Sequence, residues 1–491
     1  MKNRSLWRSA AAALVVAAAL SGCGTTTYFA GRNLPPSGLT NRVMIAVQNP
    51  NPLTKGALVF VDAYYDIRSG YTGTPLSYSI GGYSGALPIS IQNMPEEQLG
   101  AVYGSGDGSF SLISYAKENA AGTVSGLNGL SSSVFLSRSQ AYVVAASQAS
   151  HVLTMVNRST GGSYALNLPG VYRVSMNPGG SMAMAFVENS NYVYYPMQLT
   201  AAQTLAYSGG PVTWPKAAED CEPMNGPIWC LFQAQSPDHT DATGHFYGAP
   251  LTFDRPVKAV FSNDGGTAYV LNCGPECGGS NASVSILQVA PMIFLSGQAS
   301  GLLPTSGSIP IIPIPGGASN ALVASTTLYV VGQQPVQVNG QTLYTGNMTL
   351  VNLQNNTVVP STSAVPNPAS ISDGVPGGPS RLLLADDNTL WITMTKCTNG
   401  VRAANGLPDG CLTMVNTTNN TVTMLEPYLG DGTGITAVSG FHKIYTAEGG
   451  QVYIYSTVDG TAIDNQYVTV TGTAYDVAYM DATTDADNTV Y

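Results

Sequence analysis

The sequence predicts an all-β protein, a β-propeller of seven or eight four-stranded antiparallel blades. Short apolar and β-branched runs alternate with Gly, Asn and Asp turns over most of the 491 residues, and no amphipathic helix of any length interrupts them. The runs recur in the order strand, Asp-Gly turn, strand, loop, strand, turn, strand, with a period of roughly 40 to 60 residues. Closing such units into a ring hides the sheet edges, which keeps a strand-rich chain soluble.

Residues 1–22 are predicted to be a lipoprotein signal peptide. Lys2, Arg4 and Arg8 precede an apolar run from Ala10 to Leu20, which is too short to span a bilayer and is typical of a secretory signal. The run leads into the letters LSGC, which end at Cys23 and resemble the bacterial lipobox. That resemblance implies diacylation of the cysteine thiol, cleavage just before it, and anchoring by two or three acyl chains.

Residues 23–41 are expected to form the lipidated cysteine and a flexible tether rich in Pro, Gly and Thr. Gly24 follows the cysteine, and in the sorting pattern of Gram-negative lipoproteins a residue other than Asp there favours the outer membrane. We therefore expect a lipid-anchored protein of the bacterial cell envelope. The sequence leaves open whether its body faces the periplasm or the cell surface.

Residues 42–491 carry the repeat. Its clearest unit starts at Val257 and reads VKAVFSNDGGTAYVLNCG, ASVSILQV and SIPIIPIPG, which are four strands with their turns. A first unit runs from Arg42 to Gly82, and the last run, AYDVAYMDA from Ala474 to Ala482, resembles the first strand of a unit that ends early. We expect this run to complete the N-terminal unit, so that strands from the two chain ends close the ring.

The second strand of each unit carries an aromatic or apolar anchor residue. These anchors are Tyr103, Tyr142, Met184, Tyr269, Tyr329, Trp391 and Tyr445. The longest gap, 85 residues, separates Met184 from Tyr269 and predicts an insertion at about residues 205–256.

One unit resembles a known repeat family. DGGTAYVLN, Asp264 to Asn272, resembles the YVTN-type propeller repeat, in which Asp-Gly precedes a strand reading roughly Tyr-Val-Thr-Asn. The resemblance implies a propeller similar to those of 6-phosphogluconolactonase-type lactonases. No lactonase active-site residue can be placed on this sequence.

Composition limits the partners. The signal holds three of the 18 basic residues and none of the 28 acidic ones, so the mature chain is acidic, with a net charge of −13. Nucleic acid is excluded as a partner, because phosphate binding needs clustered Lys and Arg. Low Lys and Arg content also argues against a phosphorylated substrate. Charged residues make up only 9% of the chain, so neutral polar groups maintain solubility.

Six of the seven cysteines fall into local pairs, which predicts three disulfides in an oxidising compartment. The pairs are Cys221 with Cys230, Cys273 with Cys277, and Cys397 with Cys411. The last two lie between the second and third strands of their units, so they are expected to stiffen loops on one face of the disc, where a partner would be met. The alternative of a zinc site lacks the usual ligand spacing.

Candidate metal or acid-base residues are few. Asp238, His239, Asp241 and His245 lie close together in the insertion and combine imidazole with carboxylate, although a polar surface loop is the commoner explanation of such a segment. The Asp-rich turns at 430–434 and 481–488 lack the ligand spacing of an EF-hand. His151 and His442 are interpreted as surface residues near strand ends. We predict no cofactor and assign no catalytic residue.

These observations favour a non-enzymatic binding or scaffolding module for a protein or glycan ligand. Tyrosine, with 27 copies against 11 of Phe, suits such contacts but also suits packing within strands. The alternative is a propeller enzyme, lactonase-like or another hydrolase or lyase, with its site at the central channel. Such an enzyme would require acidic or His residues from several blades to meet at the channel mouth.

Overall fold

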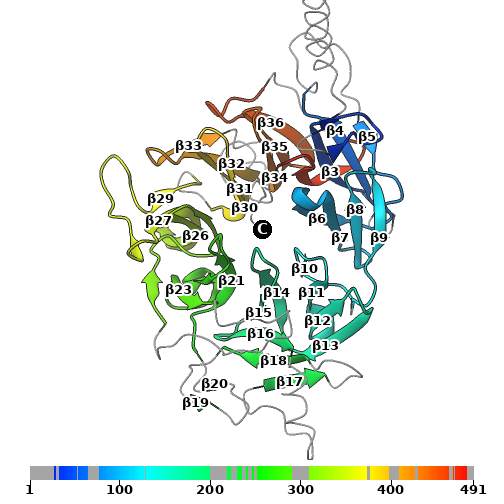
Figure 1. Ribbon diagram of the computed structural model, residues 1–491. Coiled ribbons are helices and arrows are strands. Elements are labelled where there is room, and N and C mark those ends of the chain that lie inside the picture. Colours follow the sequence, from blue (N-terminus) through cyan, green and yellow to red (C-terminus); the bar gives the residue numbers. More distant parts are fainter. Residues whose placement is uncertain are drawn as a thin grey trace, which may run out of the picture.

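A computed structural model shows a ring of eight β-sheets, the blades, around a central channel (Figure 1). It describes residues 27–28, 32–51, 54–64, 77–127, 129–198, 218–222, 229–234, 239–240, 246–247, 251–289, 309–372, 376–397, 409–425, 430–463, 468 and 470–483. Within these ranges no helix is long and apolar enough to cross a membrane. The predicted fold class is confirmed, and of the two predicted blade numbers the higher one is correct.

The blades are numbered along the chain, and each is given from its innermost strand outward. Blade 1 contains β37 (Thr473–Tyr479), β3 (Arg42–Gln48), β4 (Ala57–Asp62) and β5 (Ser77–Ser79). Blade 2 contains β6 (Pro88–Met94), β7 (Leu99–Gly104), β8 (Ser109–Ser114) and β9 (Asn119–Thr123). Blade 3 contains β10 (Ser133–Leu136), β11 (Tyr142–Ser147), β12 (Val152–Asn157) and β13 (Gly162–Asn167). Blade 4 contains β14 (Val171–Met176), β15 (Ala183–Val187), β16 (Val193–Gln198), β18 (Trp229–Gln233) and β17 (Ala218–Glu222).

The second half of the ring follows the same plan. Blade 5 contains β21 (Pro256–Phe261), β22 (Thr267–Asn272), β23 (Ser283–Gln288) and β24 (Ile311–Pro313). Blade 6 contains β25 (Asn320–Ala324), β26 (Thr327–Val338), β27 (Gln341–Asn352) and β28 (Thr357–Val358), with β29 (Ala369–Ser370) also on β27. Blade 7 contains β30 (Gly378–Ala385), β31 (Thr389–Cys397), β32 (Asp409–Asn416) and β33 (Thr421–Leu425). Blade 8 contains β34 (Gly432–Val438), β35 (Lys443–Glu448) and β36 (Gln451–Ser456), with bridges from Val452 to Val468 and from Tyr455 to Ala462 at its outer edge.

Strands from both chain ends close the ring in blade 1, as predicted. β37 pairs antiparallel with β3 from Val43 opposite Tyr479 to Gln48 opposite Thr473.

A buried ion cluster, here called the closure cluster, joins the same two ends. Arg42 is 1% exposed, and its guanidinium donates to both carboxylate oxygens of Asp481, at 3.0 and 2.6 Å, and to Glu118 at 2.8 Å. The polar groups of this cation are therefore satisfied by two carboxylates.

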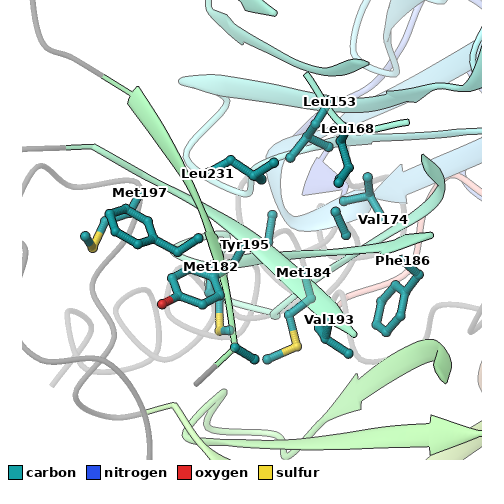
Figure 2. Packing of buried hydrophobic residues seen from close by; sticks show 14 of the residues in the cluster. Leu153, Leu168, Val174, Met182, Met184, Phe186, Val193, Tyr195, Met197 and Leu231 are labelled. Atoms are coloured by element: carbon teal, nitrogen blue, oxygen red, sulfur yellow. The ribbon is translucent and has the colours of Figure 1, made fainter. Parts of the chain in front are cut away.

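The hydrophobic core lies between neighbouring blades. The largest cluster runs through blades 3, 4 and 5, and Figure 2 shows Leu153 and Leu168 of blade 3 lying against Val174 of blade 4. The side chains of Met184 and Tyr195, also in blade 4, are only 1% exposed in the same cluster. All seven predicted anchor residues lie in the second strands of their blades, six of them buried and Tyr142 half-buried. The tyrosine content of these strands therefore serves packing.

The predicted insertion contributes to blade 4. Its strands β18 and β17 add outside β16, so they take the outer positions of a five-stranded sheet. Cys221 stands opposite Cys230 in this added hairpin, and the two form a disulfide. The insertion thus supplies the outer edge of a blade in addition to its loops.

Candidate functional site in the central channel

Most innermost strands contain a β-bulge near their start, and these bulges lie at the same height along the channel. In the described residues the register shifts in β6, β14, β21, β30, β34 and β37, each time leaving one residue unpaired with the second strand. The residues that follow the bulge, with the corresponding residues of β10 and β25, form a group that we call the channel ring. Its members, from blade 1 to blade 8, are Asp476, Ser90, Ser133, Arg173, Lys258, Asn320, Arg381 and Gly434.

Side chains of the channel ring connect neighbouring blades. The Arg381 guanidinium donates through Nε to the carbonyl of the bulged residue Thr433 in blade 8, at 3.1 Å. Asn320 donates in the same way to the Ser380 carbonyl in blade 7, at 3.4 Å. The bulge exposes these carbonyls toward the preceding blade, because it breaks the ladder there. One role of the ring is therefore structural.

Lys258 is the most deeply placed cation of the ring. It is 6% exposed, and its ammonium donates to the amide oxygen of Asn320 at 2.7 Å. Burial lowers the pKa of Lys258 well below its usual value, and the neighbouring charges of Arg173 and Arg381 lower it further. Its hydrogen-bond acceptor is neutral, so this contact does not compensate the positive charge.

The carboxylate of the ring lies beyond Arg381. Asp476 is 1% exposed, and its Oδ2 lies 3.8 Å from the Arg381 guanidinium while also accepting the backbone N–H of Ile91 at 2.8 Å. Burial raises the pKa of Asp476 to about 6, and the nearby Arg381 opposes this rise. Gly434 lies between the two blades, and a Cβ there would be 2.6 Å from the Asp476 Cα, so only glycine permits this approach.

A cavity of about 620 Å³ lies on the ring axis, with Lys258 in its lining. Innermost strands of six blades contribute to it. Apolar side chains predominate in its walls; they are Met94, Phe135, Leu136, Met176, Val260, Phe261, Leu322, Val323 and Leu384. Cavities of this size and lining suit small-molecule ligands.

The cavity opens where the innermost strands end. Residues of the turns between first and second strands line it there, including Asn177, Asn263 and Ser325. Glu96 of the turn after β6 and Arg138 of the turn after β10 also line the cavity and form an ion pair with each other. We call this end of the channel the mouth.

Two disulfides lie at the opposite end of the strands. Cys273–Cys277 and Cys397–Cys411 both follow second strands, which run away from the mouth. Glu276, within the smaller loop, accepts the backbone N–H of Gln333 in blade 6 at 3.0 Å. The structure thus contains all three predicted disulfides, but the channel cavity opens on the other face from these two.

The remaining sequence candidates separate into two groups. Asp238, Asp241 and His245, like the lipidation residue Cys23, lie outside the described residues, and His239 is described only as backbone of the short strand β19 (His239–Thr240). His442 is exposed and lies 2.7 Å from Asp387, and His151 is an exposed turn residue. Among the described residues no three His, Cys, Asp or Glu side chains are close enough to hold a metal ion.

Sequence reasoning missed the channel ring. Its signal was present, because Arg173, Lys258 and Arg381 occur at the same place in three first strands, VYRVSM, PVKAVF and PSRLLL. A charged residue in a strand of otherwise buried apolar residues marks a special environment. Aligning the repeats on their first strands, instead of on the second-strand anchors, would have brought the three cations together.

Comparison with known proteins adds little to this geometry. No protein-family model matches the sequence, and no curated protein matches it. Among solved structures, dihydro-heme d1 dehydrogenase NirN is similar with a TM-score of 0.47 and 11% identity, over 89% of this chain and 75% of that chain. A protein from Lactobacillus plantarum has a TM-score of 0.45 and 8% identity, over 89% and 99% of the two chains. A putative 6-phosphogluconolactonase from Bacteroides fragilis has a TM-score of 0.41 and 10% identity, over 89% and 98%. Likenesses this weak carry no argument about function.

Proposed function

We propose that this protein is a non-enzymatic binding module, anchored by a lipid on Cys23 to the outer membrane of a Gram-negative envelope, and that its channel cavity receives a small ligand. The observation that carries the binding role is the cavity itself, about 620 Å³ with apolar walls and the buried Lys258 in its lining. An apolar pocket with a few polar groups is the usual form of a ligand site. The signal and lipobox-like letters of residues 1–23 support the anchoring.

A partner protein or glycan is a further part of this proposal. The loop closed by Cys273–Cys277 supports it, since a loop fixed in advance loses little entropy on binding. Tyr344 on the β26–β27 hairpin donates to the Pro275 carbonyl at 3.3 Å, so this hairpin and the smaller disulfide loop hold each other. This face could meet a partner while the channel is occupied from its mouth.

The anchoring is tested with the full chain expressed in a Gram-negative host. For the wild type we expect an N-terminal peptide beginning at residue 23 with the mass of attached acyl chains, and recovery of the protein with outer membranes. Cys23→Ser should lose the acyl mass and the signal cleavage that depends on it, whereas Thr25→Ser, just outside the LSGC letters, should behave like the wild type. An unmodified wild-type peptide cut elsewhere would contradict the anchor.

The binding role is tested by thermal unfolding of the purified full chain against a library of small anions, cations and neutral molecules. A ligand that binds only the folded state raises the midpoint by mass action. We expect at least one class of small molecule to raise it at saturating concentration. If no class does so, the channel is not a ligand site and the binding role would have to rest on the loop face.

Lys258 also favours a second candidate, a hydrolase or lyase at the central channel. An amine whose pKa is lowered is unprotonated more often, so it serves better as a base or nucleophile. The measurement that separates the two candidates is turnover of simple lactones and esters. Turnover that disappears in Lys258→Met would establish the enzyme, whereas binding without turnover supports the module.

A further inference from the structure

The channel ring carries more cations than carboxylates, with Lys258 buried and Arg173 and Arg381 half-buried, and this inequality identifies a ligand class. Among its described members three are cations, Arg173, Lys258 and Arg381, and one is a carboxylate, Asp476. Asp476 lies near Arg381, at 3.8 Å, and it also accepts backbone N–H groups. The excess positive charge is therefore on the side of blades 4 and 5, where Arg173 and Lys258 repel each other.

The cavity walls change character away from the ring. Three residues beyond the ring positions stand Met176, Phe261, Val323 and Leu384 in blades 4 to 7. At a rise of about 3.3 Å per residue these side chains lie roughly 10 Å along the channel from the ring. Leu384 is 40% exposed although it is a large apolar side chain. The cavity thus has a cationic end at the ring and apolar walls between the ring and the polar residues of the mouth.

The cationic end is the deep one, so a ligand has to place its anionic group inward. An uncompensated buried ammonium is costly, and an anion that pairs with it removes this cost. A doubly charged phosphate would meet apolar walls over most of the cavity, which disfavours it. A single carboxylate on an apolar body pairs with the ammonium at the ring, while the body contacts the apolar walls.

The mouth lies on the face of the propeller where the N-terminal segment joins blade 1. β3 begins beside the end of β37, and the preceding segment runs over the mouth face, where Arg32 donates to the Pro95 carbonyl at 2.6 Å, next to the cavity residue Glu96. Ser37 likewise donates its backbone N–H to Glu118 at 2.8 Å. If Cys23 is lipidated, the mouth is on the side of the molecule from which the anchor leaves, which favours an acid derived from lipid.

We propose that the channel cavity binds an amphipathic organic monocarboxylate, with its carboxylate on Lys258 and its apolar body extending past Phe261 and Leu384 toward the mouth. This inference rests on the proposed binding function and names its ligand class. An acyl chain and an aromatic acid share the required chemistry, and the experiment separates these two sources.

Binding to this site takes up protons. Arg173 on β14 and Arg381 on β30 face Lys258 and are positive, and Asp476 on β37 is reached through Arg381, whereas Asn320 on β25 is neutral. These neighbours and burial disfavour the ammonium form in the empty cavity, and a bound carboxylate favours it. Affinity should therefore fall as the pH rises.

The test uses the wild-type full chain in lipid nanodiscs, with empty discs as reference, and isothermal titration calorimetry. The probes are octanoate, 1-octanol, octyltrimethylammonium and 2-naphthoate. We expect octanoate to bind one to one, 1-octanol at least tenfold more weakly, and octyltrimethylammonium not at all. Tighter binding of octanoate than of 2-naphthoate indicates an acyl chain as the source, and the reverse indicates an aromatic acid.

Variants locate the carboxylate. Lys258→Met should weaken octanoate binding by 10-fold to 100-fold and abolish the dependence of the binding enthalpy on the ionisation enthalpy of the buffer, which reports proton uptake. Arg173→Gln should weaken binding without abolishing proton uptake, and the exposed Lys117→Met serves as the matched control. Equal octanoate affinity in Lys258→Met overturns the inference.

The two proposals fail in different ways. Binding of 1-octanol or octyltrimethylammonium in preference to octanoate leaves the binding module in place and overturns the carboxylate. Absence of binding for every probe, together with no effect of any small molecule on thermal unfolding, overturns the channel as a ligand site altogether.

Discussion

Two charge clusters of the molecule, the buried closure cluster and the partly buried channel ring, are built on opposite principles. In the closure cluster one cation, Arg42, meets two carboxylates, Asp481 and Glu118, at 2.6 and 2.8 Å. In the channel ring three cations share one carboxylate, and the acceptor of Lys258 is a neutral amide. Buried charges without compensation are retained at a cost in stability. The comparison shows that burial alone does not distinguish a structural charge from a candidate ligand-binding charge. The number of opposite charges around it does.

The largest loss in the free energy of unfolding is expected in the closure cluster, where carboxylates fully compensate the cation. Asp481→Ala removes one of the two carboxylates on the buried Arg42 guanidinium, leaving Glu118 and the Tyr115 carbonyl, and it also removes the acceptor of the Arg42 backbone N–H, at 2.7 Å. Breaking a buried ion pair from one side costs about 3–5 kcal/mol. We expect a loss of this size in the free energy of unfolding, measured by urea denaturation.

The matched control is Asp459→Ala, an exposed turn residue that accepts the backbone N–H of Thr461 at 3.0 Å. It should cost less than about 1 kcal/mol, because exposed residues contribute little. Equal losses in the two variants would show that the closure cluster has no special part in closing the ring.

A smaller, pH-dependent effect is expected at the carboxylate of the channel ring. The pKa of Asp476 is about 6 in the folded chain, above that of an unfolded aspartate, so the folded state binds more protons between about pH 4 and pH 6. Stability contributed by this group is therefore present below pH 4 and is lost as the pH rises through 6. The change is on the order of 3 kcal/mol.

Asp476→Asn removes this titration. Denaturation at pH 4 and at pH 7 should show that the wild type loses stability relative to the variant over this interval. A constant difference between the two proteins would mean that the pKa of Asp476 is ordinary. Glu276, whose burial raises its pKa to about 7, is present in both proteins and cancels in the comparison.

The sequence was sufficient for the fold because its signals are local. Asp-Gly turns such as Asp264–Gly265 and alternating apolar runs determine hairpins, and a regular period determines a ring. The number of blades was left open because the described residues form only isolated bridges at the outer edge of blade 8, and because blade 1 is assembled from both chain ends. These features depend on contacts between distant residues, which no local pattern records.

The candidate site was harder to predict for the same reason. Arg173 and Lys258 are 85 residues apart, and they come together because their blades are neighbours in the ring. Low overall Lys and Arg content argued against nucleic acid and a phosphorylated substrate, yet three cations at one level are enough to make a small cationic site. Overall composition therefore describes the surface of this protein better than it describes the channel.

The smallest effect, and the one opposite in sign, is expected for Lys258→Met. The variant removes an uncompensated buried ammonium, and the amide oxygen of Asn320 still accepts the backbone N–H of Ala321 at 2.9 Å. We expect the free energy of unfolding at neutral pH to be unchanged or raised by about 1 kcal/mol.

The pH dependence gives this prediction its control. The pKa of Lys258 is lower in the folded chain than in the unfolded chain. Between these two pKa values the unfolded state binds more protons, so wild-type stability falls as the pH falls. The advantage of Lys258→Met should therefore grow from pH 9 toward pH 6, while the exposed Lys117→Met shows no such trend. If Lys258→Met instead destabilises the protein as strongly as Asp481→Ala, the cation is part of the scaffold, and the contrast between the two clusters disappears.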